Sequence, residues 1–213
     1  MAKKNLLIMA LALIVAGGAV AQTEKFSIGV RAIGIIPSYK PSSLNDLNSN
    51  KFTSDKAFGF AVQTSYSLTK MFGVQAEIIY DYDEVAEKHR GTERYRTIET
   101  SSLLIPVLGR IGTTVGNGVL LTGLAGIYFT LPMGQAEFVY ERGLREKYGW
   151  TGSIGAMVGG EIGHRIGPGT LFGDIRYAFD FSETTMTGIG NYWTKSALHL
   201  GIGYSISLER FKR

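Results

Sequence analysis

Eight stretches of this chain alternate apolar and polar residues with a period of two. In the stretch 57–68, Phe58 and Phe60 fall on one side, and Gly59 and Gln63 fall on the other. Successive side chains of a β-strand point to opposite faces, so this spacing gives strands with one apolar face and one small or polar face. A bilayer admits such strands only as a closed barrel, because an open edge leaves backbone groups unpaired. The pattern therefore predicts an all-β, eight-stranded antiparallel transmembrane β-barrel.

The connections between the predicted strands alternate between short and long. Barrels of the outer membrane keep turns short on the periplasmic side and loops long outside. With an even number of strands, this alternation predicts that both termini are periplasmic. The predicted strands are 26–36, 57–68, 72–82, 98–111, 119–131, 148–164, 171–181 and 197–208. Short turns are expected at 69–71, 112–118 and 165–169, and long loops at 37–56, 83–96, 132–147 and 182–194.

The first residues have the three parts of an export signal. Two lysines supply positive charge at the start, the stretch 6–15 is apolar, and a small-x-small motif ends at Ala21, just before Gln22. We expect cleavage between Ala21 and Gln22, so that 1–21 is a signal peptide and 22–213 is one barrel domain. The alternative, a transmembrane anchor, needs a longer apolar run than this segment offers.

Composition and residue spacing exclude several classes of function. Removal of the two signal lysines leaves 20 basic residues against 18 acidic ones, so there is no electrostatic case for nucleic acid. The absence of cysteine excludes disulfides, thiol catalysis and cysteine-based metal sites. His89, His164 and His199 lack the spacing of metal ligands, and none lies beside a serine with a carboxylate to orient it. We therefore expect no enzymatic activity, no metal and no cofactor.

Charged residues fall on the inward face of several predicted strands. The interior of an eight-stranded barrel is only about wide enough for its own side chains, so buried charges have to be paired. We expect a low layer of Arg110, Glu161 and Asp174, and a layer nearer mid-height that contains Arg31, Glu77 and Arg176. Together these six residues predict a hydrogen-bonded ion network that fills the lumen. The alternative is a narrow, porin-like channel for ions or small solutes, gated by rearrangement of the same pairs.

The last predicted strand carries a second pattern. His199, Gly201, Tyr204 and Ile206 have the spacing polar-x-Gly-x-x-hydrophobe-x-hydrophobe. This spacing resembles the signal that the outer-membrane barrel-insertion machinery reads, which makes that machinery an expected partner during biogenesis.

The long loops are the remaining candidates for an interaction surface. The segments 81–99 and 137–147 mix acidic and basic residues without aromatic anchors, which is typical of ordinary solvated surface. We expect solvated hairpin extensions that contact lipopolysaccharide, and recognition of an extracellular partner is the alternative. Aromatic residues, among them Trp150 and Trp193, are expected to form a girdle near the outer rim.

Together with the export signal, three segments of the chain resemble the outer-membrane β-barrel domain family, which includes PorT-like proteins. These segments are 102–110, 171–179 and 200–205. The resemblance implies the fold and a location in the outer membrane of a Gram-negative-type bacterium, and it lends no catalytic residue. The leading hypothesis is a non-enzymatic integral barrel with a structural or surface-interaction role. The narrow channel and a soluble, lipocalin-like ligand carrier, whose apolar face would surround its ligand, are the alternatives.

Overall fold

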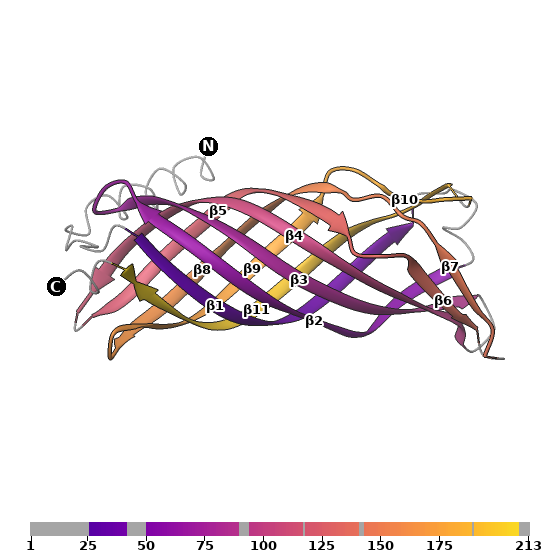
Figure 1. Ribbon diagram of the computed structural model, residues 1–213, viewed down its shortest axis with the longest axis horizontal. Helices are drawn as coiled ribbons and strands as arrows, with labels where there is room; N and C mark the ends of the chain where they lie inside the picture. Colours follow the sequence, from indigo (N-terminus) through magenta and orange to yellow (C-terminus); the bar gives the residue numbers. More distant parts are fainter. Residues whose placement is uncertain are drawn as a thin grey trace, which may run out of the picture.

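The computed structural model describes residues 26–41, 50–89, 94–116, 118–140, 143–188 and 190–208, and within them the fold consists of strands (Figure 1). The predicted signal peptide and the cleavage position between Ala21 and Gln22 lie outside the described residues. The strands are β1 (Phe26–Pro41), β2 (Asn50–Ser67), β3 (Phe72–His89), β4 (Arg94–Val115), β5 (Val119–Pro132), β6 (Ala136–Tyr140), β7 (Arg145–Tyr148), β8 (Ile154–Ile166), β9 (Gly169–Asp180), β10 (Thr184–Met186) and β11 (Gly190–Ser207).

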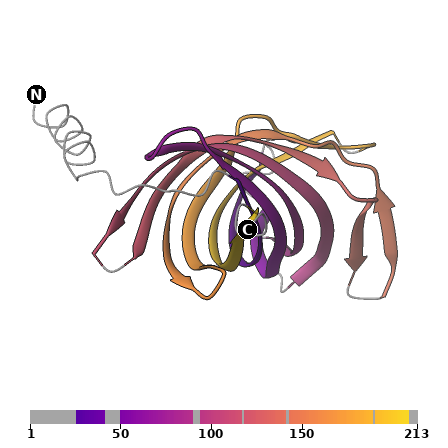
Figure 2. The same cartoon turned by 60° about the vertical axis from the view of Figure 1, so that its left-hand side comes forward.

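Eight of these strands form a closed antiparallel ring. Each of them pairs with the next along the chain, from β1 through β2, β3, β4, β5, β8 and β9 to β11, and β11 pairs back with β1. Figure 2 shows these strands curving around a common axis. The predicted eight-stranded barrel is therefore confirmed. Among the described residues, no helix is both long enough and apolar enough to cross a membrane.

The stagger of the ring follows from its register. A circuit from Phe26 through directly opposite residues returns to β1 at Ile36, ten residues further along. Eight strands with this stagger tilt by about 40° from the barrel axis and leave an interior that side chains fill. The circuit runs through Phe26, Tyr66, Val74, Gly109, Ala125, Val158, Tyr177, Leu198 and Ile36.

The exterior of the ring is apolar, as the alternation predicts. On β2, for example, Phe60 and Val62 are 58% and 51% exposed, whereas Ala61 and Gln63 between and beside them are buried. The same alternation holds on the other ring strands. The exposed apolar side chains include Val30, Ile36, Ile78, Val107, Ile127, Val158, Ile162, Ile175, Leu200 and Ile202.

The interior is less polar than the sequence pattern predicts. A buried apolar cluster crosses the lumen and separates two polar regions. On β3, for example, the inward residues run Glu77, Ile79, Asp81, so an isoleucine lies between two carboxylates. We call this cluster the apolar layer, and its buried members are Ile33, Ile35, Ala61, Ile79, Leu104, Leu108, Leu124, Tyr128, Met157, Ala178 and Ala197.

The two ends of the barrel differ. At the short-turn end, β4 and β5 are joined at 116–118, and β8 and β9 at 167–168. Gly116, Gly118 and Gly167 have positive φ angles in these turns, a conformation that glycine adopts at little steric cost. Ser27 of β1 pairs with Ser207 of β11, so the N-terminal end of β1 and the C-terminal end of β11 lie on this side.

At the long-loop end, much of what was predicted as loop is strand. β3 continues to His89 and β4 begins at Arg94, and the β6–β7 hairpin adds to the edge of β4 (Figure 1). Apolar side chains of these extensions, of β10 and of the start of β11 pack into a second apolar cluster, which we call the end cluster. Its buried members are Val85, Ile98, Ala136, Phe138, Met186 and Trp193.

The end cluster corrects two of the predicted positions. Trp193 is 4% exposed and belongs to the cluster, and Trp150 packs against it, so neither indole lies in an exterior girdle. The predicted strand 148–164 begins only at Ile154, because the residues before it belong to β7 and to a bridge between Trp150 and Met186. The alternation of apolar and polar residues does not by itself distinguish a tryptophan on the exterior from one that packs over the end of the lumen.

Candidate functional site

A network of ion pairs occupies the middle of the lumen, on the short-turn side of the apolar layer. Alternation turns Arg31 of β1, Glu77 of β3 and Asp174 and Arg176 of β9 inward from different sides of the ring. Arg31 Nη1 donates to Asp174 Oδ1 at 2.8 Å, and Arg176 Nη1 donates to Glu77 Oε1 at 2.6 Å. Arg31 Nη2 lies 3.3 Å from Glu77 Oε2, and Arg176 Nε lies 2.9 Å from Asp174 Oδ1. These last two contacts are within ion-pair distance but lack the alignment of hydrogen bonds.

The network continues toward the short-turn end. Arg110 Nη2 donates to Glu161 Oε1 at 3.3 Å, and Arg176 Nη2 lies 4.0 Å from Glu161 Oε2. The structure thus brings together all six residues predicted for the lumen, and it joins the two predicted layers through Arg176. Three arginines face three carboxylates, so the charges of the six balance.

The side chains at the centre of this network are completely buried. The side chains of Arg31, Glu77, Asp174 and Arg176 are 0% exposed. Gln75 is buried beside them and donates to Glu77. Charges held in this way are stable only as partners, because burial of a lone charge carries a large desolvation penalty. The ion network and the apolar layer next to it are both buried inside the ring.

Gly201 has a structural role in this network. A Cβ atom at this position would lie 2.3 Å from Asp174 Oδ2 and 3.0 Å from Arg31 Cδ, so a side chain here would displace the ion pair. The other residues of the predicted insertion signal occupy different surroundings. His199 is buried in the lumen, Ile206 pairs with Ile28 of β1, and the Tyr204 hydroxyl donates to the backbone oxygen of Ile166 at 2.8 Å. Their use as an insertion signal stays a prediction.

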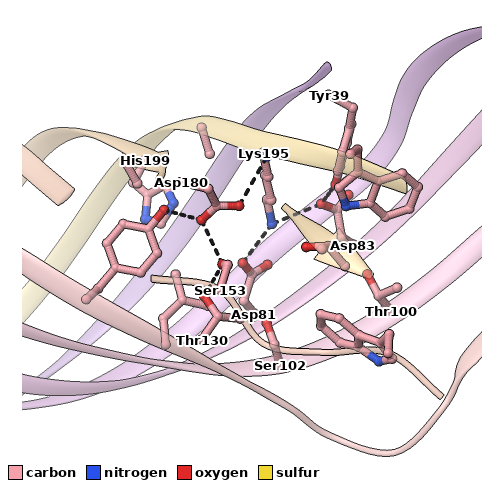
Figure 3. A pocket seen from close by; sticks show the side chains of 17 residues that line it. Tyr39, Asp81, Asp83, Thr100, Ser102, Thr130, Ser153, Asp180, Lys195 and His199 are labelled. Carbon is pink, nitrogen blue, oxygen red and sulfur yellow. Dashed lines mark hydrogen bonds and ion pairs between the residues drawn. The ribbon is translucent and has the colours of Figure 1, made fainter. Parts of the chain in front are cut away.

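A second polar site lies on the other side of the apolar layer, toward the long-loop end (Figure 3). Lys195 of β11 reaches across the lumen, and its Nζ lies 2.9 Å from Asp81 Oδ2 and 3.1 Å from Asp83 Oδ2. Asp83 also accepts a hydrogen bond from the Tyr39 hydroxyl. We call this region the lysine pocket. Its lining also includes the hydroxyl-bearing residues Thr100, Ser102, Thr130, Ser153 and Thr184, and Leu104, Trp150, Ala178, Trp193 and Ala197.

Asp180 and His199 complete the polar lining of the lysine pocket. Asp180 Oδ1 accepts hydrogen bonds from the Tyr128 hydroxyl at 2.6 Å and the Ser153 hydroxyl at 2.8 Å, and its Oδ2 accepts one from the backbone N–H of Lys195 at 3.1 Å. His199 is 1% exposed, and neither of its ring nitrogens has a hydrogen-bond partner among the described residues. Asp81 Oδ1 is likewise buried without a donor.

Sequence reasoning found only part of the lysine pocket. The positions of Asp81 and His199 on the inward face follow from the alternation. Asp83 is the first residue of the predicted loop 83–96, and Lys195 lies just after the predicted loop 182–194, so neither falls in a predicted strand. Continuing the period of two, from Glu77 through Asp81 to Asp83 on β3, is the signal that finds Asp83.

The charged segments at the long-loop end form ion pairs among themselves. In the β6–β7 hairpin, Arg145 Nη1 donates to Glu137 Oε1 at 2.6 Å. Hydrogen bonds from the hydroxyls of Tyr148 and Tyr140 hold the pKa of Glu146 below its ordinary value. The surface is thus a hairpin extension with its own pairing. No group of three histidine or carboxylate side chains in the described ranges has the arrangement of a metal site.

Comparison with known proteins gives matches only among solved structures. No protein-family model and no curated protein matches the chain. Its fold is similar to that of the outer membrane protein OprG from Pseudomonas aeruginosa, with a TM-score of 0.58 at 14% identity, covering 87% of this chain and 97% of that one. Neisserial surface protein A gives a TM-score of 0.54 at 14% identity, covering 86% of this chain and 97% of that one.

A third solved structure agrees with the first two. It is a major outer membrane protein from Thermus thermophilus, with a TM-score of 0.50 at 12% identity, covering 85% of this chain and 99% of that one. At such identities the likeness concerns the fold alone, and the resemblance to PorT-like proteins in particular stays a prediction. The chain has the fold of the small, eight-stranded outer-membrane β-barrels.

Proposed function

We propose that this protein is an integral β-barrel of the bacterial outer membrane, exported through a cleaved signal peptide, with both termini in the periplasm. One observation carries the proposal: a closed ring exposes aliphatic and aromatic side chains all round its exterior, while the six charges of the ion network are paired inside. Monomeric soluble proteins rarely expose contiguous apolar patches larger than a few hundred Å². The surrounding lipid is the partner that such an exterior requires.

We further propose a structural or surface-interaction role without conduction or enzymatic activity. The buried ion network and the apolar layer support the view that side chains close the lumen. The hairpin extensions at the long-loop end would face the outside and contact lipopolysaccharide through charged residues such as Arg145 and Lys147, which are about 60% exposed. The soluble carrier hypothesis requires the opposite arrangement, with the apolar face around an internal ligand.

Membrane extraction separates the integral barrel from the soluble carrier. We expect the protein to remain in the membrane pellet after alkaline carbonate treatment, because its exterior is stabilised by lipid. We also expect the purified protein in detergent to migrate differently on gels before and after boiling, as folded barrels do. Release into the carbonate supernatant would contradict the proposal.

Planar bilayer recording tests the absence of conduction. We expect the folded protein to insert without discrete current steps, because Arg31, Glu77 and Arg176 are paired at 0% side-chain exposure in the middle of the lumen. A porin reconstituted in the same bilayers serves as the positive control. Reproducible current steps that change in size when Glu77 is replaced by glutamine would establish the channel alternative instead.

A further inference from the structure

The lysine pocket carries a charge imbalance that the ion network does not. Asp81, Asp83 and Asp180 line it, and Lys195 is the one lysine or arginine among the lining residues. Asp180 is satisfied by neutral donors, namely two hydroxyls and a backbone N–H, so its negative charge has no cation of its own. Burial of uncompensated charge is unfavourable, and a bound cation would relieve this cost.

The lysine itself shows which chemical group the pocket accommodates. Its ammonium lies between two carboxylate oxygens, at 2.9 Å from Asp81 and 3.1 Å from Asp83. An ammonium has three N–H donors and no acceptor, so it suits a pocket whose side chains offer acceptors. Asp81 uses only Oδ2 for Lys195, and its Oδ1 is buried without a donor.

His199 provides a second, independent indication of a ligand. Its ring lines the pocket, is 1% exposed, and has no hydrogen-bond partner at either nitrogen among the described residues (Figure 3). A neutral imidazole has one nitrogen that accepts a hydrogen bond. A second ammonium in the pocket would therefore find two unused acceptors, Asp81 Oδ1 and one nitrogen of His199.

The remaining walls suit an aliphatic or cationic ligand better than a bare metal ion. Leu104, Ala178 and Ala197 provide an apolar side, and the indoles of Trp150 and Trp193 line the same pocket. Aromatic faces attract organic cations. A metal ion would need a set of at least three suitably placed histidine or carboxylate ligands, which the described residues do not provide.

We propose that the lysine pocket binds a small aliphatic primary amine in its ammonium form. The ammonium donates to Asp81 Oδ1 and to His199, beside the ammonium of Lys195, and the alkyl chain packs against the apolar wall. This inference goes beyond the proposed function and requires only the folded barrel, so it is tested separately from membrane integration and conduction.

Tryptophan fluorescence gives a direct test, because the chain contains two tryptophans, Trp150 and Trp193, and both line this pocket. The full-length folded protein in detergent is titrated with butylamine and putrescine at constant ionic strength. We expect a saturable change in emission with either amine and none with 1-butanol or 1,4-butanediol. No saturable change with the amines, or the same change with the alcohols, overturns the proposal.

Substitutions in the pocket sharpen the test in both directions. D81N is expected to weaken amine binding at least tenfold, because it removes the carboxylate that the ligand shares with Lys195. K195Q is expected to strengthen binding at least tenfold, because it frees the acceptors that Lys195 occupies. E84Q removes one negative charge from a residue outside the pocket lining and is expected to leave binding unchanged.

Heat-dependent gel mobility confirms that each variant is folded before it is titrated. Should D81N fail to fold, K195Q and the alcohol controls still decide the question. Equal affinities in the wild type, K195Q and E84Q would contradict the proposed position of the ligand. A response to Zn²⁺ or to a neutral sugar in place of the amines would assign the pocket to another class of ligand and reject the amine.

Discussion

Replacement of Arg176 by methionine is expected to lower the free energy of unfolding by about 3 to 5 kcal/mol. Arg176 contacts Glu77 at 2.6 Å and Asp174 at 2.9 Å, and its side chain is 0% exposed. The substitution keeps a similar volume but leaves two buried carboxylates with Arg31 as their main cation. Urea titration of the protein in lipid vesicles, followed by tryptophan fluorescence, measures the loss.

Two further variants show that the loss comes from the unbalanced charge. In the double variant E77Q/R176M, the pair of Arg31 and Asp174 remains and the charges balance again, so we expect it to be more stable than R176M alone. R145M removes an arginine from an exposed pair at the long-loop end, where Arg145 is 59% exposed, and should have only a slight effect. An E77Q/R176M protein as unstable as the sum of its single variants would argue against a coupled network.

Replacement of Ile78 by arginine is expected to destabilise the protein in lipid vesicles by about 2 to 4 kcal/mol. Ile78 is 55% exposed and lies in the middle of the apolar exterior of β3, opposite Val62 of β2. A charged side chain at this depth would lie in hydrocarbon. The same urea titration measures the effect, alongside the yield of heat-modifiable protein after refolding into vesicles.

Leu144 provides a matched control for this experiment. It is 58% exposed, close to the value for Ile78, but it lies in the connection between β6 and β7, beyond the ring. L144R is expected to change stability by no more than about 0.5 kcal/mol, as is usual for a surface residue in water. If both positions tolerate arginine equally, the exterior of the barrel is exposed to water, and the proposed membrane location is wrong.

The facing of the ring strands could be predicted because the side-chain period of a strand is two, and a shift by one residue would turn the apolar side chains inward and the charges outward. Arg31 and Asp174 were therefore placed in the lumen from the sequence. Their contact at 2.8 Å could not be predicted, because it depends on how β1 and β9 are each staggered against β11, which lies between them. A pattern within one strand contains no information on that stagger.

The residues of the lysine pocket could likewise be predicted only in part. The alternation predicts the inward facing of Asp81 and His199, but Lys195 falls between the predicted loop 182–194 and the predicted strand 197–208, because the strands extend beyond the stretches whose outward residues are strongly apolar. Outside that zone the exterior no longer needs to be apolar, so the alternation weakens while the backbone pairing continues. The predicted girdle position of Trp193 is wrong for the same reason. At this height the indole is buried by packing in the end cluster instead of facing the exterior.

The sequence by itself determined that the chain forms a closed eight-stranded barrel, and which side chains face outward where the alternation is regular, because backbone pairing and alternate faces are local requirements repeated along every strand. The tertiary structure alone decided which inward charges meet, where the apolar layer divides the lumen, and that one end encloses Lys195 between two aspartates. These features depend on the relative heights of residues on strands distant in the sequence. That height is set by the closure of the ring.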